Sequence, residues 1–105
     1  ELERYADRPL KIGSFSAASN VTGILTDTAT ITRVLHEHGA LAFWDYAAAG
    51  PYVDIDASNE DAVFLSPHKF IGGPGTPGVL VVNRKLLTNT VPVGAGIVIS
   101  FSLPT

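Results

Sequence analysis

The 105-residue sequence contains no cysteine. The chain therefore has no disulfide, no thiolate metal site and no thiol nucleophile, which fits a cytoplasmic setting. It also has no apolar run approaching the roughly 18–20 residues that span a bilayer, so we expect no membrane association. Residues 1–8 alternate in charge and lack the basic and then apolar stretch of a secretory signal, so we expect no targeting segment.

Positive charge is sparse and scattered along the chain. Seven lysine and arginine residues stand against ten aspartate and glutamate residues, which gives a formal net charge of −3. Nucleic-acid-binding domains gather positive charge into a patch, so we expect no nucleic-acid partner. We also expect no metal site, because His36 and His38 are two residues apart on a predicted helix and point in different directions. They are typical of a solvated pair near a helix C-terminus, where positive charge is tolerated.

The length suits a single domain with one modest core. A helix of about three turns is predicted in its first half. Asp27 stands at an N-cap position, apolar residues recur at helical spacing from Ile31, and Gly39 stands where a C′ glycine ends a helix. Both ends of this helix are therefore predicted from the sequence.

Four segments carry the signals of β-strands: residues 10–18, 40–44, 62–65 and 78–83. The middle two are continuous apolar runs, typical of strands buried on both faces of a parallel sheet, so Phe43, Trp44 and Phe64 are most simply core residues. The last strand is close enough in sequence to pair antiparallel with the one before it. Residues 86–105 have weak patterning, and only their apolar, β-prone last ten residues stand out.

The order of these elements predicts an α/β fold with a mainly parallel sheet and one antiparallel strand. One helix is too little to cover both faces of such a sheet. We therefore expect residues 1–105 to be a single partial domain that belongs to a larger α/β domain.

Polar residues follow directly after three of the predicted strands: Asn20, Asp45 and the group Ser66, His68 and Lys69. In open α/β sheets, ligands bind outside the carboxyl ends of the strands, so we expect these clusters to converge on one edge. A lysine there is either an ordinary loop residue or a partly desolvated amine that attacks an aldehyde. The aspartate is either a loop cap or a carboxylate that holds a cationic partner.

Three motifs stand in order along the chain: Ser19-Asn20-Val21-Thr22-Gly23, Trp44-Asp45-Tyr46-Ala47, and Ser66-Pro67-His68-Lys69-Phe70 with the glycine-rich run 72–78. Taken together they resemble the class V aminotransferases, the pyridoxal-phosphate enzymes that include cysteine desulfurases and selenocysteine lyases. The similarity covers about residues 9–96 and implies the central part of the large domain of the fold-type I pyridoxal-phosphate-dependent transferases.

This resemblance implies a role for each candidate residue. Lys69 would form a Schiff base with pyridoxal phosphate, and Asp45 would keep the pyridine nitrogen protonated so that the ring acts as an electron sink. Asn20 would contact the region of the phenolic oxygen, and Ser66 and His68 would contact the phosphate. Family members are typically dimers with sites near the interface, so we expect a homo-oligomer whose glycine-rich loop closes over the site or reaches the partner subunit.

The chain also departs from the family pattern. Members often carry a glutamine three residues after the aspartate, where this sequence has Ala48. Gly94-Ala95-Gly96 resembles the start of a segment that serves the neighbouring subunit, but residues 97–101 do not continue it. Complete members are several times as long, and the resemblance places these residues in the middle of their large domain, without the upstream phosphate-binding loop, the aromatic residue that stacks on the ring or the downstream arginine that holds a substrate carboxylate.

Two hypotheses follow for the function. The first is a fragment of a pyridoxal-phosphate enzyme that acts on an amino acid by aminotransfer or by lyase chemistry like that of the desulfurases, with Lys69 as the cofactor lysine. The alternative is a truncated, non-catalytic α/β domain that folds and self-associates, because missing helices would leave sheet faces or edges exposed. Binding of the cofactor at Lys69 distinguishes the two.

Overall fold

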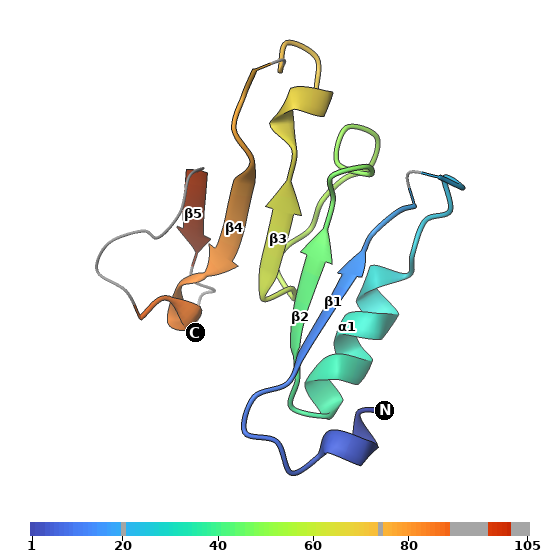
Figure 1. Cartoon of the computed structure of the whole chain (residues 1–105), viewed down its shortest axis with the longest axis vertical. Coiled ribbons are helices and arrows are strands. Elements are labelled where there is room, and N and C mark those ends of the chain that lie inside the picture. The colour runs from blue at the N-terminus through green and yellow to red at the C-terminus, as the bar shows by residue number, and fades with distance from the viewer. Residues whose placement is uncertain (20, 74, 89–96, 102–105) are drawn as a thin grey trace.

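The computed structural model describes residues 1–19, 21–73, 75–88 and 97–101. In these ranges the chain forms five strands, one α-helix and three short 3-10 helices (Figure 1). None of these helices has the length and apolar character needed to cross a membrane. In chain order the elements are η1 (Glu3–Tyr5), β1 (Ile12–Ser16), α1 (Thr28–Glu37), β2 (Leu41–Asp45), β3 (Ala62–Leu65), η2 (Pro67–Lys69), β4 (Val79–Asn83), η3 (Arg84–Leu86) and β5 (Ile97–Phe101).

The strands form one sheet in the order β1-β2-β3-β4-β5. β1, β2 and β3 are parallel, β3 and β4 are antiparallel, and β4 and β5 are again parallel. The predicted α/β class, the parallel strands and the antiparallel pair are therefore confirmed. β5 lies in the segment that the sequence marked only as β-prone, and it adds a second strand in the direction of β4.

Both predicted ends of α1 are confirmed. The Asp27 carboxylate accepts hydrogen bonds from the backbone N–H of Thr30 at 3.2 Å and from its hydroxyl at 2.8 Å, and these bonds lower the pKa of Asp27. Gly39 has a φ of +69°, the left-handed conformation that lets the chain turn away from a helix. Lys11 Nζ donates to the carbonyl of His38 at 2.6 Å and so satisfies one of the last carbonyls of the helix.

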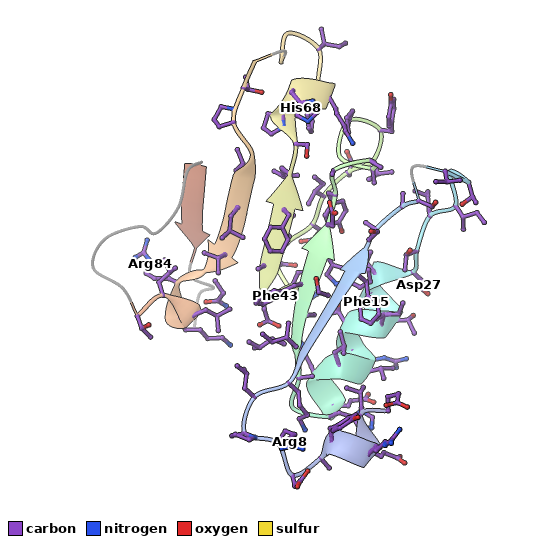
Figure 2. The ribbon with its side chains drawn as sticks, in the orientation of Figure 1. Arg8, Phe15, Asp27, Phe43, His68 and Arg84 are labelled. Carbon is purple, nitrogen blue, oxygen red and sulfur yellow. The ribbon has the colours of Figure 1, made fainter. Side chains whose placement is uncertain are left out.

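The core lies between α1 and one face of β1 and β2. Trp44 has no exposed surface, its Nε1 donates to Thr32 Oγ1 at 2.8 Å, and its ring centroid lies 5.8 Å from that of Phe15. Figure 2 shows Phe15 on the side of the sheet where α1 runs. A side chain at Gly13 would lie 2.5 Å from Leu35 of α1, so a glycine there lets the helix approach β1 closely.

The opposite face of the sheet is only partly covered. Phe43 and Phe64 pack edge to face there, with their ring centroids 6.2 Å apart. Phe64 is 38% exposed and Ile12 is 48% exposed. The prediction that Phe64 is a core residue is therefore wrong, because no helix in the described part of the chain covers this face.

A buried carboxylate ties α1 to the sheet. Asp61 Oδ2 accepts a hydrogen bond from the backbone N–H of Ala42 at 2.7 Å and lies 2.8 Å from His36 Nε2. The backbone of Asp61 also bonds to Ala42 and to Asn83 of β4. His36 therefore has a specific partner and is not simply solvated, as its spacing from His38 had indicated.

Glu60, next to this carboxylate, is buried and only half satisfied. It is 5% exposed, and its Oε1 accepts a hydrogen bond from the hydroxyl of Tyr46 at 2.8 Å. Its Oε2 is buried without a partner among the described residues. Burial raises the pKa of Glu60, and burial together with the Glu60 hydrogen bond raises the pKa of Tyr46 to about 12.

Replacing Glu60 by glutamine is therefore expected to stabilise the fold increasingly as the pH rises from about 4 to 8. The folded state favours the protonated acid, so the stability that Glu60 contributes is present at low pH and is lost as the pH rises through its folded-state pKa. Glutamine stays neutral and still accepts from Tyr46, so we expect a gain of about 1 kcal/mol at pH 8 and none near pH 4. Urea unfolding across this range measures it, with Glu3→Gln at an exposed position as the control; a difference independent of pH would contradict it.

Candidate active site

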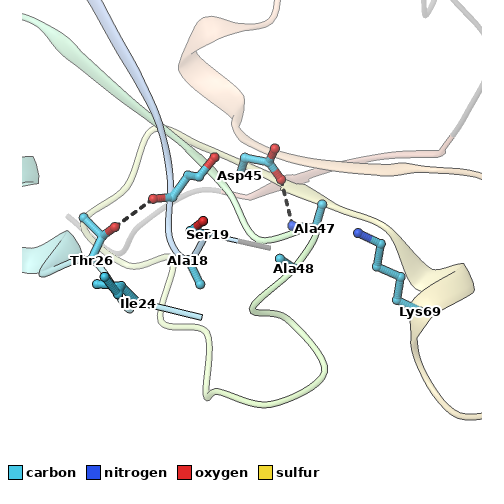
Figure 3. A pocket seen from close by; sticks show the side chains of 9 residues that line it. Ala18, Ser19, Ile24, Thr26, Asp45, Ala47, Ala48 and Lys69 are labelled. Carbon is cyan, nitrogen blue, oxygen red and sulfur yellow. Dashed lines mark hydrogen bonds between the residues drawn. The ribbon is translucent and has the colours of Figure 1, made fainter. Parts of the chain in front are cut away.

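A cavity of about 460 Å³ lies at the carboxyl ends of β1 and β2 (Figure 3). Asp45 closes one side of it and Lys69, which follows β3, reaches it from the other. The parallel pairing brings Ser16, the last residue of β1, directly beside Asp45. Ser19 and Thr26, from the loop between β1 and α1, complete its polar lining.

Asp45 is half-buried at the end of β2 and is held in place by the turn that follows. Its Oδ1 accepts a hydrogen bond from the backbone N–H of Ala47 at 2.7 Å, and its carbonyl accepts from Ala17 at 2.9 Å. Within the described residues, its Oδ2 makes no hydrogen bond. The loop-cap interpretation of this aspartate therefore accounts for one carboxylate oxygen and leaves the other available to a ligand.

Lys69 is the last residue of η2, a single turn that begins with Pro67. Its backbone N–H donates to the carbonyl of Ser66 at 3.0 Å, and the next N–H donates to the carbonyl of Pro67 at 2.9 Å. The proline has its ring at a position where a missing N–H is tolerated, which favours this tight turn directly after β3. The side chain then extends into the cavity, where Figure 3 shows its amine directed toward Ala47 and Ala48.

The glycine-rich segment packs against the turn that carries Lys69. The N–H of Gly73 donates to the carbonyl of Phe70 at 3.0 Å, and both the N–H and the hydroxyl of Thr76 donate to the carbonyl of Gly73, at 3.1 and 2.6 Å. A side chain at Gly73 would overlap the carbonyl oxygen of Pro67 and lie 2.8 Å from its carbonyl carbon. Only glycine therefore fits where this segment contacts η2.

The structure brings together some of the predicted site residues. Asp45 and Lys69 line one cavity, as the topological argument predicted. Asn20 lies outside the described residues. Ser66 and His68 flank and form η2, but neither is among the described residues that line the cavity, although Figure 2 shows His68 at this end of the sheet.

Sequence reasoning missed three polar residues of the cavity, Ser16, Ser19 and Thr26. Ser19 lies within the first motif, and its hydroxyl accepts from the N–H groups of Val21 and Thr22, both at 3.2 Å. Thr26 donates from its hydroxyl to the carbonyl of Ser16 at 2.9 Å, which fixes the end of the same loop beside β1. Ser19 could have been found from its place in the first motif, whereas no local pattern indicated Thr26.

Comparison with known proteins identifies the family. A family model described as "Aminotransferase class-V" matches residues 1–103. The chain belongs to the class V aminotransferase family. The resemblance stated from the three motifs is thus confirmed, and the family is one of pyridoxal-phosphate-dependent enzymes.

The curated relatives are enzymes several times longer than this chain. A probable cysteine desulfurase of Staphylococcus epidermidis is 41% identical over 88 residues, which are 82% of this chain and 21% of that protein. A cysteine desulfurase of Synechococcus elongatus is 33% identical over 98 residues, or 91% and 16% of the two chains. A kynureninase of Pseudomonas fluorescens is 30% identical over 89 residues, or 82% and 21%. The chain spans about a fifth of the length of these class V relatives.

A solved structure shows the same fold. The NifS-like protein from Rickettsia africae superimposes with a TM-score of 0.71 over 90% of this chain and 28% of its own, at 21% sequence identity. Because the identity is low, the likeness establishes the fold alone. It confirms that the sheet and its helix form part of the class V α/β fold.

The cavity fits the cofactor that the class V family uses. Its two charged groups are of the kinds that pyridoxal phosphate requires, an amine for its aldehyde and a carboxylate for its ring nitrogen. The Oδ2 of Asp45, which makes no hydrogen bond to a described residue, could accept from that nitrogen, and the exposed side chain of Lys69 could reach the aldehyde. The hydroxyls of Ser19 and Thr26 add polar groups to the wall.

Proposed function

We propose that this chain forms the cofactor-lysine part of a pyridoxal-phosphate enzyme that acts on an amino acid, with Lys69 as the residue that holds the cofactor. The observation that carries the proposal is the presence of Lys69 and Asp45 in the same cavity at the carboxyl end of the sheet. In this proposal residues 1–105 are a single partial domain, which agrees with the short span of the chain relative to its relatives.

Asp45 would orient the cofactor ring and supply the negative charge that faces its nitrogen. When bound, pyridoxal phosphate supplies an electron-withdrawing ring that stabilises negative charge at the α-carbon of an amino acid. The carboxylate of Asp45, held through Oδ1 by the N–H of Ala47, would keep a proton on the ring nitrogen through Oδ2. A carboxylate fixed by a backbone bond loses little freedom when it accepts this second bond, so its placement favours the protonated ring.

Lys69 has two tasks in the proposed reaction. Its Nζ would hold the cofactor until the amino group of the substrate replaces it, and the released amine is then the group in the described lining that can take the proton from the α-carbon. The short turn of η2 and the contact with Gly73 hold the lysine backbone in position for both tasks. Removing the amine is therefore expected to remove both the attachment of the cofactor and the proton transfer.

The remaining site residues keep the roles that the resemblance implies. Asn20 would contact the phenolic oxygen of the cofactor, and Ser66 and His68 would contact its phosphate. His68 is exposed next to Lys69 on η2, so its ring can turn toward an anion without leaving a buried position. The names of the relatives, cysteine desulfurase and kynureninase, support an amino-acid substrate.

A second copy of the chain is part of the proposal. The face opposite α1 leaves Ile12 and Phe64 at 48% and 38% exposure, and covering such apolar surface favours association. Self-association without cofactor binding is the alternative function, that of a truncated, non-catalytic domain. Cofactor attachment therefore decides between the two.

Attachment of the cofactor can be tested on the isolated chain. We expect added pyridoxal phosphate, after borohydride reduction and peptide mapping, to be found on Lys69 well above its level on Lys85. Lys85 is exposed and serves as the internal control, whereas Lys11 already donates to His38 and is a less suitable reference. The variant Lys69→Ala should lose the site-specific adduct and the accompanying absorption band, and Lys85→Ala should keep both. Labelling spread evenly over the lysines would favour the non-catalytic alternative.

A further inference from the structure

A second cavity of about 570 Å³ adjoins the candidate active site. The two cavities share Ala18, Ser19, Ala48 and Lys69, so the lysine lies on the boundary between them. A volume of this size is ample for an amino-acid side chain. Beyond the shared residues, we define the apolar chamber by Gly23, Leu25, Ala49, Tyr52 and Val53.

The chemistry of the chamber differs from that of the neighbouring cavity. Of the described residues that line the chamber, none carries a carboxylate, and Lys69 is the one charged side chain. The neighbouring cavity instead contains Asp45 together with the hydroxyls of Ser16 and Thr26. A lysine that takes the proton from the α-carbon must be neutral, so a charged side chain in the chamber finds no counter-ion among the described lining residues during that step, which makes its burial there unfavourable.

Two hydrogen-bonded loops build the walls of the chamber. On one side, residue Leu25 forms a β-bridge with Ala18, and the N–H of Ser19 donates to the carbonyl of Ile24 at 3.1 Å. On the other side, the N–H groups of Tyr52 and Val53 donate to the carbonyl of Ala49 at 2.9 and 3.1 Å. Both walls are therefore formed by the chain itself before any ligand binds.

The large apolar side chains that line the apolar chamber are exposed to solvent. Tyr52 is 84% exposed and Leu25 is 62% exposed. An apolar group that enters the chamber would remove part of this surface from water, which favours its binding. A polar or charged group would gain nothing from the same contact.

We propose that the apolar chamber receives the side chain of the amino-acid substrate, and that the preferred substrates are amino acids with an aliphatic or aromatic side chain. This inference rests on the proposed function, because it takes Lys69 as the point where the cofactor and the substrate meet. The lysine on the boundary places the reacting α-carbon between the polar cavity and the chamber. The polar cavity then holds the cofactor, and the chamber selects the side chain.

Stable conjugates of reduced pyridoxal phosphate with single amino acids test this selection without any catalytic turnover. Isothermal titration of the full chain would compare phosphopyridoxyl-leucine and phosphopyridoxyl-phenylalanine with phosphopyridoxyl-glutamine and phosphopyridoxyl-lysine. We expect the two apolar conjugates to bind at least about tenfold more tightly than the two polar ones. The cofactor part is the same in all four, so the difference reports the side chain alone.

A charge placed in the chamber should change the preference. In the variant Tyr52→Asp we expect weaker binding of the leucine conjugate and tighter binding of the lysine conjugate, because the new carboxylate supplies the missing counter-ion. The matched control is Ile71→Asp, which adds the same charge at an exposed apolar residue outside the described linings of both cavities. This control should keep the preference of the unmodified chain.

Failure of this inference is distinguishable from failure of the proposed function. Equal binding of the four conjugates, binding of none, or a preference unchanged in Tyr52→Asp would each overturn the chamber as the side-chain site. Selective labelling of Lys69 by pyridoxal phosphate is scored in the same samples and decides the proposed function independently. Selective labelling of Lys69 together with equal binding of the four conjugates would thus support the cofactor site and contradict only the substrate preference.

Discussion

Replacing Gly73 by alanine is expected to abolish the selective attachment of pyridoxal phosphate to Lys69. The ratio of borohydride-trapped adduct on Lys69 to that on Lys85 should fall by at least about tenfold, since a displacement of about 1 Å at a reacting group costs up to about a hundredfold. Mass spectrometry of the reduced, digested chain measures this ratio directly.

The physical cause is a steric clash between the added side chain and the backbone of η2. A side chain at residue 73 would overlap the carbonyl oxygen of Pro67 and lie 3.0 Å from the carbonyl oxygen of Phe70. Neither atom belongs to a side chain that can rotate away, so η2 itself must move. The hydrogen bond from Gly73 to Phe70, 3.0 Å long, is then strained, and Lys69 moves with the turn.

Gly78→Ala is the matched control for this effect. It makes the same substitution in the same segment, but the added carbon would lie 3.8 Å from the carbonyl oxygen of Leu65, an ordinary contact. We expect this variant to retain the labelling ratio. Circular dichroism and the fluorescence of the buried Trp44 confirm that each variant is folded. A folded Gly73→Ala chain with an unchanged ratio would show that the glycine does not position the lysine.

Much of the fold could be predicted because its signals are local. The helix depends on the carboxylate of Asp27 at one end and on the left-handed Gly39 at the other, and each acts within a few residues of itself. Strand β3 was predicted with its observed bounds, because it is a short apolar run between polar segments. The pairing of Asp45 with Lys69 in one cavity followed from the rule that parallel strands end at one edge.

The remaining features depend on contacts between distant segments. His36 contacts Asp61 across 25 residues, and Glu60 is buried against Tyr46 at the other end of the connection between β2 and β3. No local pattern indicates either contact. The exposure of Phe64 depends on what covers its face of the sheet, which the apolar run itself does not specify. The walls of the apolar chamber are likewise made by two loops whose composition predicts only turns.

Replacing Trp44 by alanine is expected to destabilise the fold by about 3–5 kcal/mol. The side chain is the largest that is fully buried, and its loss leaves a cavity between α1 and the sheet. Domains of this size are stable by about 5–15 kcal/mol, so the variant should lose a large part of its stability and its Tm should fall by more than about 10 °C. Urea and thermal unfolding followed by circular dichroism measure the loss, because the variant has no tryptophan to report it.

Two further variants separate packing from hydrogen bonding at this position. Trp44→Phe keeps most of the ring but removes the N–H that donates to Thr32 Oγ1 at 2.8 Å, so it should cost about 1–3 kcal/mol. Combining it with Thr32→Val removes the unpaired hydroxyl, and the double variant should lose about 1 kcal/mol less than the sum of the single ones. Additive losses would show that the hydrogen bond contributes nothing to stability.

The position of Trp44 also determines which way Asp45 faces. Successive side chains of a strand point to opposite faces, so burying Trp44 under α1 directs the carboxylate of Asp45 to the other side. A shift of β2 by one residue would exchange the two, placing a carboxylate in the core and the indole in the cavity. The folded Trp44→Phe variant is therefore expected to retain selective labelling of Lys69, because the phenyl ring still favours the same register. Loss of labelling in a folded Trp44→Phe chain would show that an aromatic ring under α1 is not sufficient to orient Asp45.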